Sequence, residues 1–591
     1  MRTLTQRSAG WLPAALALIA ISGAGHVNAA KGTSSAVPAH PDDKTIIHVL
    51  NRIGFGPRPG DMERVRTMGL QAYIDRQLRP EKVDDPQIAA RLASLETLDK
   101  SSREIAEQYL MPAQMLRLQQ RQQQQAAALP EAAAPMTATP GLASSNAATP
   151  PPAAGRPRDP RTPEQIGAAK VERAVMTDLT EQKVLRAVYS ERQLDEVMVD
   201  FWFNHFNVFA GKGQTRGYLT EYERDAIRPH VLGRFRDLLG ATAQSPAMLF
   251  FLDNWQSSAP ADAETLPPDP KGRPARPVPP TPRIARRSPV AGGRQNLPEQ
   301  GQRVAPAAQN RRGRGLNENY ARELMELHTL GVDGGYTQKD VQEVARALTG
   351  WTIQNPRLGG GFVFQPRMHD AGPKLVLGHT IKSGGGQHDG ELVLDILASH
   401  PSTARFIATK LVRRFVADTP PATLVDRAAR RFHDTDGDIR EVVRTIVTSP
   451  EFFSAAAYRA KVKTPFEFVV SAVRATGTDA PSGLPLVAAL RDLGMPLYMC
   501  QPPTGYADRA DAWVNTGALL ARMNFAVSLT SPRRPRGNPA IPADPALARD
   551  TLARDVLGGD LSPATQSTVA QAQQGPQAVA LMLGSPEFQK R

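Results

Sequence analysis

Apolar residues recur at every third or fourth position through most of the chain, which is the spacing of helices that bury one face. Within residues 319–330, for example, Ala321, Leu324, Met325 and His328 fall on a single helical face. This stripe predicts a helix with a buried His328 side chain. Because such spacing dominates the sequence, we expect a mainly α fold with a multi-helix body.

The ends of one helix are marked by polar residues. Thr337 and Asp340 have the spacing of a capping box, in which each side chain bonds the main-chain amide of the other residue. The apolar stripe that follows stops at Gly350, a residue type that commonly ends helices. We therefore predict a helix between Thr337 and Gly350 and a structural role for Asp340.

One stretch breaks the helical spacing. Residues 362–364 and 374–381 alternate or cluster apolar side chains as strands do, with Gly and Pro between them. We predict a small β-hairpin near residues 362–381 that projects from the helical body.

The first 29 residues have the three parts of a cleaved secretory signal. Arg2 and Arg7 precede an apolar run over residues 11–25, and residues 27–29 (Val-Asn-Ala) offer a small-residue cleavage site. The apolar run is shorter than the roughly 20 residues of a membrane-spanning helix, although a membrane anchor remains the alternative. We expect an exported, soluble protein in a periplasmic or extracellular space, with no transmembrane segment.

Two stretches have the composition of disordered, low-complexity insertions, one rich in Gln, Ala and Pro and one rich in Pro and Arg. They divide the chain into segments with separate helical patterns. The predicted divisions are a signal peptide (1–29), an N-terminal helical segment (40–118), a Gln/Ala/Pro-rich linker (119–164), a helical segment (165–256), a Pro/Arg-rich disordered insertion (257–314), a main helical segment (315–532) and an Ala-rich C-terminal helical tail (533–591).

Charge is concentrated in the second insertion. Residues 257–314 hold eleven basic and four acidic side chains, within a chain whose formal net charge is +13. Such a tract can bind acidic polymers or an anionic cell surface, or it can be a solvated insertion with no ligand. The arginines are not interleaved with aromatic side chains, and export removes the chain from nucleic acid, so no nucleic-acid partner is expected.

Eight sequence blocks follow one another along the chain and carry a resemblance to a known family. They are NRIGFGPRP (51–59), FWFNHFNV (201–208), NENYARELMELHTLGV (317–332), YTQKDVQEVARALTGW (336–351), HDAGPKLVLG (369–378), HPSTARFIATKL (400–411), GDIREVVRTIVTSPEF (437–452) and PPTGYADRADAWVNTGALLARMNF (502–525). In this order they resemble a bacterial exported family known as domain of unknown function 1800. The resemblance implies a mainly helical fold and supplies no established activity and no catalytic residues. Genes of that family often neighbour another exported family, which resembles alkaline phosphatases and sulfatases, so the resemblance suggests a co-exported protein of that kind as a partner.

Candidate metal ligands lie on the helix that contains His328. Glu323, Glu326 and His328 are close together along it, but the Glu-x-x-His spacing of carboxylate-bridged metal sites is missing because residue 325 is Met. A core histidine without a metal is the alternative.

A candidate binding wall lies in the aromatic block over residues 201–209. Trp202 and His205 share one helical face there, and Glu223 with Arg224 follows close by in the sequence. Such a wall suits an apolar or glycan-like ligand, or it is simply a core helix.

A candidate catalytic group precedes the predicted strand at residues 374–381. His369, Asp370 and Lys374 lie in a loop, where packing does not require an imidazole. A turn with a solvated histidine is the alternative.

No haem-attachment, nucleotide-binding or serine-hydrolase motif is present, and the single cysteine, Cys500, excludes cysteine-based metal sites, so the cofactor remains unknown.

These features lead to two main hypotheses. The first is a binding or accessory protein that acts with another exported protein or an envelope polymer. The second is a hydrolase-like or metal-dependent enzyme with a site around His369-Asp370 and His205, Glu323, Glu326 and His328. A structural component of the cell envelope is a third possibility, and the oligomeric state is not predicted.

Overall fold

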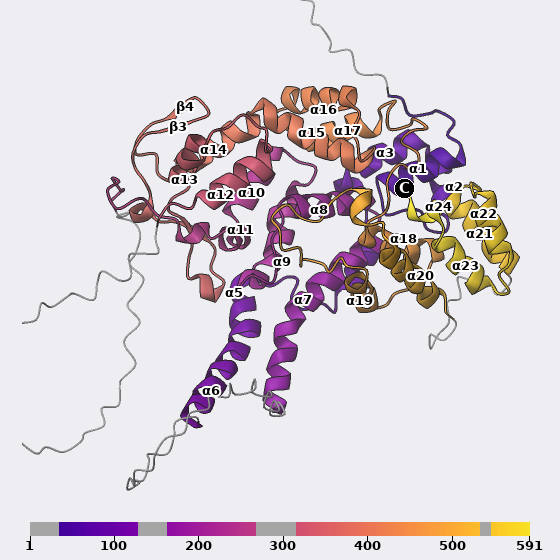
Figure 1. The fold of residues 1–591 in the computed structure, drawn as a ribbon, viewed down its shortest axis with the longest axis horizontal. Helices are drawn as coiled ribbons and strands as arrows, with labels where there is room; N and C mark the ends of the chain where they lie inside the picture. The colour runs from indigo at the N-terminus through magenta and orange to yellow at the C-terminus, as the bar shows by residue number, and fades with distance from the viewer. Residues whose placement is uncertain (1–34, 128–161, 268–314, 532–544) are drawn as a thin grey trace, which may run out of the picture.

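The computed structural model describes residues 35–127, 162–267, 315–531 and 545–591. Its elements are mainly helical, as the spacing of apolar residues predicts (Figure 1). The first half contains α1 (Asp43–Arg52), α2 (Asp61–Met68), α3 (Leu70–Gln77), α4 (Pro86–Leu92), α5 (Ser102–Ile105), α6 (Met111–Ala127), α7 (Pro163–Tyr189), α8 (Gln193–His205), α9 (Leu219–Glu221), α10 (Phe235–Gln244) and α11 (Pro246–Phe251).

The second half follows the same design, with two small sheets inserted near its start. It contains α12 (Glu318–Glu323), α13 (Gln338–Ala347), β1 (Trp351–Ile353), β2 (Phe362–Phe364), β3 (Lys374–Val376), β4 (His379–Ile381), α14 (Gln387–Ser399), α15 (Pro401–Phe415), α16 (Ala422–Asp434), α17 (Ile439–Val447), α18 (Pro465–Thr476), α19 (Leu484–Asp492), α20 (Thr516–Thr530), α21 (Pro545–Leu557), α22 (Pro563–Ala570), α23 (Gly575–Leu583) and α24 (Pro586–Gln589).

The capping box predicted for α13 is present. The Thr337 hydroxyl accepts a hydrogen bond from the amide of Asp340, and the Asp340 carboxylate accepts one from the amide of Thr337. The same carboxylate also accepts a bond from the amide of Leu377, 2.8 Å away. Asp340 therefore begins α13 and fixes the turn between β3 and β4 to it.

The prediction of one hairpin over residues 362–381 is wrong in its pairing. Phe362–Phe364 pairs with Trp351–Ile353, and Lys374–Val376 pairs with His379–Ile381, so two separate antiparallel sheets are formed. The first strand was missed because its three residues come directly after the Gly350 that ends the preceding helical pattern. All three of its side chains are buried.

The helix around His328 is not α-helical throughout. After α12, a π-helical turn covers Leu324–Thr329, in which the Leu330 amide bonds the Met325 carbonyl at 2.7 Å. The predicted stripe is nevertheless buried, since His328 is only 2% exposed. Two further π-helical turns cover Ala106–Leu110 and Tyr222–Ile227.

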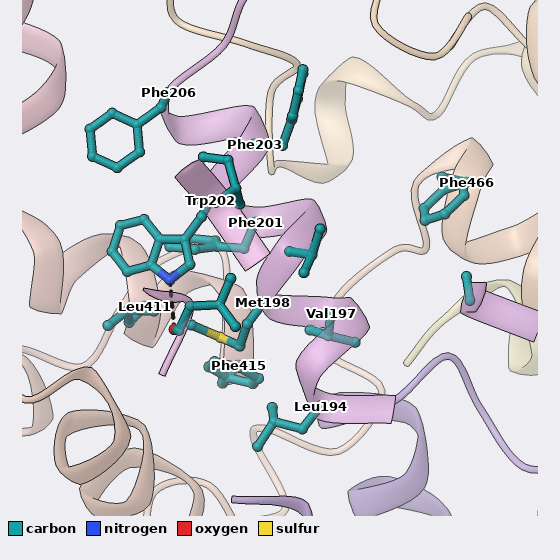
Figure 2. Packing of buried hydrophobic residues seen from close by; sticks show 14 of the residues in the cluster. Leu194, Val197, Met198, Phe201, Trp202, Phe203, Phe206, Leu411, Phe415 and Phe466 are labelled. Atoms are coloured by element: carbon teal, nitrogen blue, oxygen red, sulfur yellow. Dashed lines mark hydrogen bonds between the residues drawn. The ribbon is translucent and has the colours of Figure 1, made fainter. Parts of the chain in front are cut away.

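One apolar core joins segments that are far apart in the sequence. It extends from Ile46 on α1 to Phe588 on α24, and α8 passes through its middle. Figure 2 shows aromatic side chains on several sides of α8 and Phe415 of α15 packed near Met198. The C-terminal helices therefore lie beside α1 and α2 (Figure 1).

Two helices extend away from this body. Figure 1 shows α6 and the first half of α7 side by side as an arm, which we call the α6–α7 arm. Helix α6 ends at Ala127, so the first nine residues of the predicted linker (119–127) are helical. None of the helices in the described ranges has the length and apolarity needed to cross a membrane.

The second predicted insertion begins with ordered residues. The Ala259 amide bonds the Met368 carbonyl at 2.8 Å, and the Ala371 amide bonds the Glu264 carbonyl at 2.8 Å. Residues 257–267 thus lie against the loop that contains His369, and the insertion was predicted to begin too early. The predicted signal peptide, residues 128–161 of the predicted linker and residues 268–314 of the predicted insertion lie outside the described residues.

Candidate functional site

The aromatic block on α8 is a core helix. Trp202 is fully buried, and its indole nitrogen donates to the Val231 carbonyl at 3.0 Å (Figure 2). Phe206 stacks on the indole and Phe235 lies tilted against it, each at a centroid distance of 5.9 Å. Because its face and its polar atom are both occupied, Trp202 does not line a binding wall.

His205 brings together three helices of the body. Its Nε2 lies 3.1 Å from the main-chain oxygen of His328, and its Nδ1 lies 2.7 Å from Nζ of Lys410 on α15. The carbonyl can only accept a hydrogen bond, so Nε2 donates and Nδ1 accepts from the lysine. We call His205, His328 and Lys410 the histidine–lysine cluster.

Burial keeps the two imidazoles of this cluster neutral. It lowers the pKa of His205 well below its usual value, with Lys410 adding to the effect. Burial and then Lys410 also lower the pKa of His328 to about 3. Burial, followed by the charge of Arg413, lowers the pKa of Lys410 to about 8.

The predicted metal ligands do not converge. Glu326 accepts a hydrogen bond from the Tyr336 hydroxyl at 3.0 Å, and Glu323 is half-buried with its pKa raised by burial and by Glu326. Nε2 of His328 is buried without a hydrogen-bond partner among the described residues. Nowhere in those residues do three or more His, Cys, Asp or Glu side chains form a group that could hold a metal ion.

His369 and Lys374 belong to a second buried cluster. His369 Nε2 lies 3.2 Å from Asp389 Oδ2, His369 Nδ1 lies 2.8 Å from the Thr349 carbonyl, and Lys374 Nζ lies 2.7 Å from the same Asp389 oxygen. Burial opposes the ionisation of Asp389, but the hydrogen bonds from His369 and Lys374 lower its pKa. We call these residues, with Asp370, the Asp389 network.

Asp370 completes this network at its edge. Its two carboxylate oxygens accept hydrogen bonds from the Arg346 guanidinium at 2.8 and 3.0 Å, and its carbonyl accepts one from Lys374 at 2.7 Å. His369 is fully buried, so the alternative of a solvated turn is wrong. The loop requires an imidazole for packing after all, because the ring links α14, through Asp389, to the end of α13.

Glu223 and Arg224 also make internal bonds. Glu223 is fully buried and accepts hydrogen bonds from Arg228 at 3.0 Å and from the Tyr498 hydroxyl at 2.6 Å. Although burial raises the pKa of Glu223, Arg228 and Lys183 lower it further, so the carboxylate is ionised. Arg224 donates to the carbonyl of Leu98 at 2.7 Å.

A small pocket of about 60 Å³ lies beside α8, with both aromatic and amide side chains in its lining. Asn204 and Asn207 line it, and both donate to carbonyls of one loop, at Tyr506 (2.8 Å) and Cys500 (2.9 Å). Burial raises the pKa of the Cys500 thiol to about 11, so this thiol is not a nucleophile near neutral pH. The amides therefore hold the loop, and the pocket has space for a few waters only.

A much larger concave surface lies elsewhere, between the α6–α7 arm and α19. It has a volume of about 1360 Å³, and we call it the arm groove. Apolar side chains from all three helices and from the segment after α19 line it, and Leu484 and Met499 among them are more than two-fifths exposed. The apolar lining includes Leu116, Met176, Leu484, Val487, Leu497 and Met499.

The charge of the arm groove is strongly positive. Four arginines line it, and Glu172 is the one acidic side chain in its lining. Arg117 and Arg216 both pair with Glu172, whereas Arg173 and Arg491 are exposed and have no ion pair with any described residue. The sequence does not reveal this groove, because the residues from 119 onward have the composition of a linker and no local pattern indicates that α19 faces the arm.

No curated protein and no solved structure matches the chain. A family model does match it, from residue 48 to residue 590, across the helical body, the arm and the C-terminal helices. The chain therefore belongs to the family described as "Protein of unknown function (DUF1800)", as the resemblance of its blocks predicts.

Proposed function

We propose that this chain is an exported binding protein whose arm groove holds an acidic, amphipathic segment of another exported protein. The observation that supports this proposal is the groove itself, which combines an exposed apolar lining with three more arginines than acids. Large exposed apolar surfaces on soluble proteins commonly mark interaction sites. The excess of arginines selects for acidic partners.

The size of the groove favours a polypeptide segment over a small molecule. Pockets for small ligands usually have volumes of about 300–1,000 Å³, and the arm groove exceeds this range. One of its walls is a pair of extended helices, against which an amphipathic helix packs well.

The two buried clusters, the Asp389 network and the histidine–lysine cluster, are weaker candidates for a binding or catalytic site than the arm groove. In the Asp389 network, Lys374 bonds one oxygen of Asp389 and Arg346 bonds both oxygens of Asp370, whereas Asp389 Oδ1 is buried without a hydrogen bond to any described residue. The histidine–lysine cluster has no carboxylate ligand in the described structure. The imidazoles of both arrangements and the Lys374 side chain are at most 2% exposed, so a substrate has little access to them. We therefore place the function at the arm groove.

Export is part of the proposal and rests on the sequence. The basic, apolar and small-residue parts of residues 1–29 have the order of a secretory signal. A periplasmic or extracellular location would bring the groove together with exported partners. Fractionation of cells that produce the full chain tests this step, and a full-length protein retained in the cytoplasm would contradict it.

The groove is tested with synthetic peptides of matched length and apolar content that differ in charge. We expect the acidic amphipathic peptide to bind at least about tenfold more tightly than its basic counterpart in fluorescence anisotropy, because the arginines repel the latter. Replacing Arg173 and Arg491 together by Glu should remove this preference.

Arg405→Glu is the matched control, since Arg405 is an exposed arginine of α15 that does not line the groove. This variant should retain the preference for the acidic peptide. Equal binding of acidic and basic peptides, or no binding of either, would contradict the proposal.

A further inference from the structure

A buried cluster of basic side chains lies where α1, α15, α18 and the C-terminal residues meet. Glu467 of α18 is at its centre, and every cation around it is at most 4% exposed. We call it the Glu467 cluster. Its cations are Arg52, Arg414, Lys461, Lys463, Arg522 and Arg591.

Three carboxylates accompany these six cations. Glu467 pairs with Arg414 and, at 3.0 Å, with Arg591. Asp418 and Asp508 both pair with Lys461, at 2.6 and 2.8 Å. When every basic group of the cluster is counted as protonated, three positive charges are in excess of the three carboxylates. Burial lowers the pKa of Lys463 to about 7 and that of Arg52 below its usual value, as expected where positive charges lack enough partners.

Several donors of the cluster have no partner. Nε and Nη1 of Arg52, Nη2 of Arg591 and Nε of Arg522 are buried without a hydrogen bond to any described residue. A buried charged donor that loses water without gaining an acceptor destabilises a fold. The sequence retains these groups although apolar residues of similar volume would avoid that cost, so an acceptor is expected nearby.

A void of about 10 Å³ lies against this cluster. Lys463, Arg591 and His48 line it, and Nδ1 of His48 is another buried atom without a partner in the described structure. The volume is that of roughly one water-sized sphere. Glu587, the acidic residue of the lining, accepts hydrogen bonds from Ser562 at 3.0 Å and is already occupied.

We propose that this void binds a single monatomic anion of the halide class, chloride in ordinary solution, between Lys463 and Arg591. A monatomic anion matches the volume, whereas phosphate and sulfate are too large for it. It offsets part of the excess positive charge, which a water molecule cannot do. Lys463 has no ion pair of its own in the described structure and lies 3.9 Å above the Phe588 ring, so it is free to bind the anion.

The proposed anion would join distant parts of the chain. Lys463 follows the segment that pairs with the C-terminal residues, in which the Arg591 amide bonds the Lys461 carbonyl at 2.8 Å. His48 belongs to α1. Bound halide would therefore stabilise the contact between the two ends of the described chain, and this role is independent of the arm groove.

Thermal unfolding of the full chain tests the proposal. Chloride is raised from about 1 mM to about 100 mM while methanesulfonate keeps the ionic strength constant, and we expect the Tm to rise by a few degrees. Lys463→Met should lose this shift. Lys183→Met is the control, because Lys183 is a similarly buried lysine that pairs with Asp200 away from the void, and it should keep the shift.

Bromide provides a second measurement that does not depend on a variant. Crystals of the unmodified protein soaked in bromide should show an anomalous peak between Lys463 and Arg591. A Tm that is equal in chloride and methanesulfonate, a Lys463→Met variant that keeps the shift, or a void without a bromide peak would each overturn the proposal.

Discussion

The Asp389 network and the Glu467 cluster are both buried and rich in ion pairs, but their charges are balanced differently. In the Asp389 network, Lys374 contacts the Asp389 carboxylate and Arg346 contacts that of Asp370. In the Glu467 cluster, six cations share three carboxylates, and several guanidinium nitrogens have no acceptor among the described residues.

This difference shows which buried polar groups point to a ligand. A histidine, an aspartate and a lysine within hydrogen-bonding distance look like a catalytic group, yet in the Asp389 network their bonds hold a loop in place. The Glu467 cluster contains no catalytic combination, but its excess of basic groups and its unpaired donors support the proposed halide site. Charge balance and unused donors are therefore better guides to binding here than residue types.

The largest loss of stability is expected when the Asp389 network is broken. Asp389→Ala leaves Lys374 buried without a carboxylate, and breaking a buried pair in this way costs about 3–5 kcal/mol. We expect the free energy of unfolding, measured by urea denaturation, to fall by that amount. Asp426→Ala is the control, because it removes an exposed partner of Arg405. It should change the free energy of unfolding by less than about 1 kcal/mol. Similar losses in both variants would show that the network is not a buried, balanced pair.

The fold could be predicted where local spacing decides the structure. The stripe ending at His328 and the capping box of Thr337 and Asp340 depend only on residues within one helix, and both are confirmed. The pairing of strands could not be predicted, because Trp351 pairs with Phe364 across a loop whose path the spacing does not specify.

The candidate sites show the same limit. Nothing near His369 in the sequence indicates that Asp389, twenty residues later, bonds both His369 and Lys374. Their catalytic role stays a prediction, but the buried geometry supplies a structural reason for each residue type. The arm groove and the charge excess around Glu467 arise only when distant helices assemble, so no local pattern reveals them.

A second prediction concerns the histidine–lysine cluster, which has no carboxylate to stabilise a charged imidazole. The folded-state pKa of His328 is about 3, compared with 6.5 for an exposed histidine. Below pH 6.5 the unfolded chain binds a proton that the folded chain does not, so stability falls as the pH falls. Each such buried histidine costs about 2 kcal/mol between pH 7 and pH 5.

His328→Leu should therefore lose about 2 kcal/mol less stability between pH 7 and pH 5 than the unmodified protein, as measured by urea denaturation at both values. The carboxylates with lowered pKa values, such as Asp389, affect stability only near pH 4 and below. Lys410, with a pKa of about 8, stays mostly protonated in this window. An unchanged pH dependence in the variant would contradict the neutral, buried state of His328.

A smaller effect is expected at the helix that positions the balanced network. Thr337→Ala removes the cap of α13, which carries Arg346, and such a change costs about 1 kcal/mol. Thr568, an exposed residue inside α22, is the control, and its replacement by Ala should be neutral or slightly stabilising. Equal urea midpoints for the two variants would show that the cap does not stabilise α13.

The smallest change in the free energy of unfolding is expected in the Glu467 cluster, where basic groups outnumber carboxylates. This prediction distinguishes the Glu467 cluster from the Asp389 network most clearly. Arg52 is fully buried, and its one hydrogen bond within the described structure goes to the Ala457 carbonyl at 2.5 Å. Burial and then Arg591 lower its pKa well below its usual value, so its charge is disfavoured in the fold. Arg52→Met should therefore change the free energy of unfolding by less than about 1 kcal/mol in chloride-free buffer.

Arg474→Met is the matched comparison, because Arg474 is equally buried but bonds the Asp61 carboxylate at 3.1 Å and the carbonyls of Gly56 and Val188. Loss of Arg474 removes one of the cations that offset the charge of the buried Asp61 carboxylate. The free energy of unfolding should therefore fall by about 3–5 kcal/mol. If urea denaturation gives equal losses for the two variants, then Arg52 has an acceptor that the described residues do not supply. Because the measurement excludes chloride, that acceptor would have to be something other than the proposed halide.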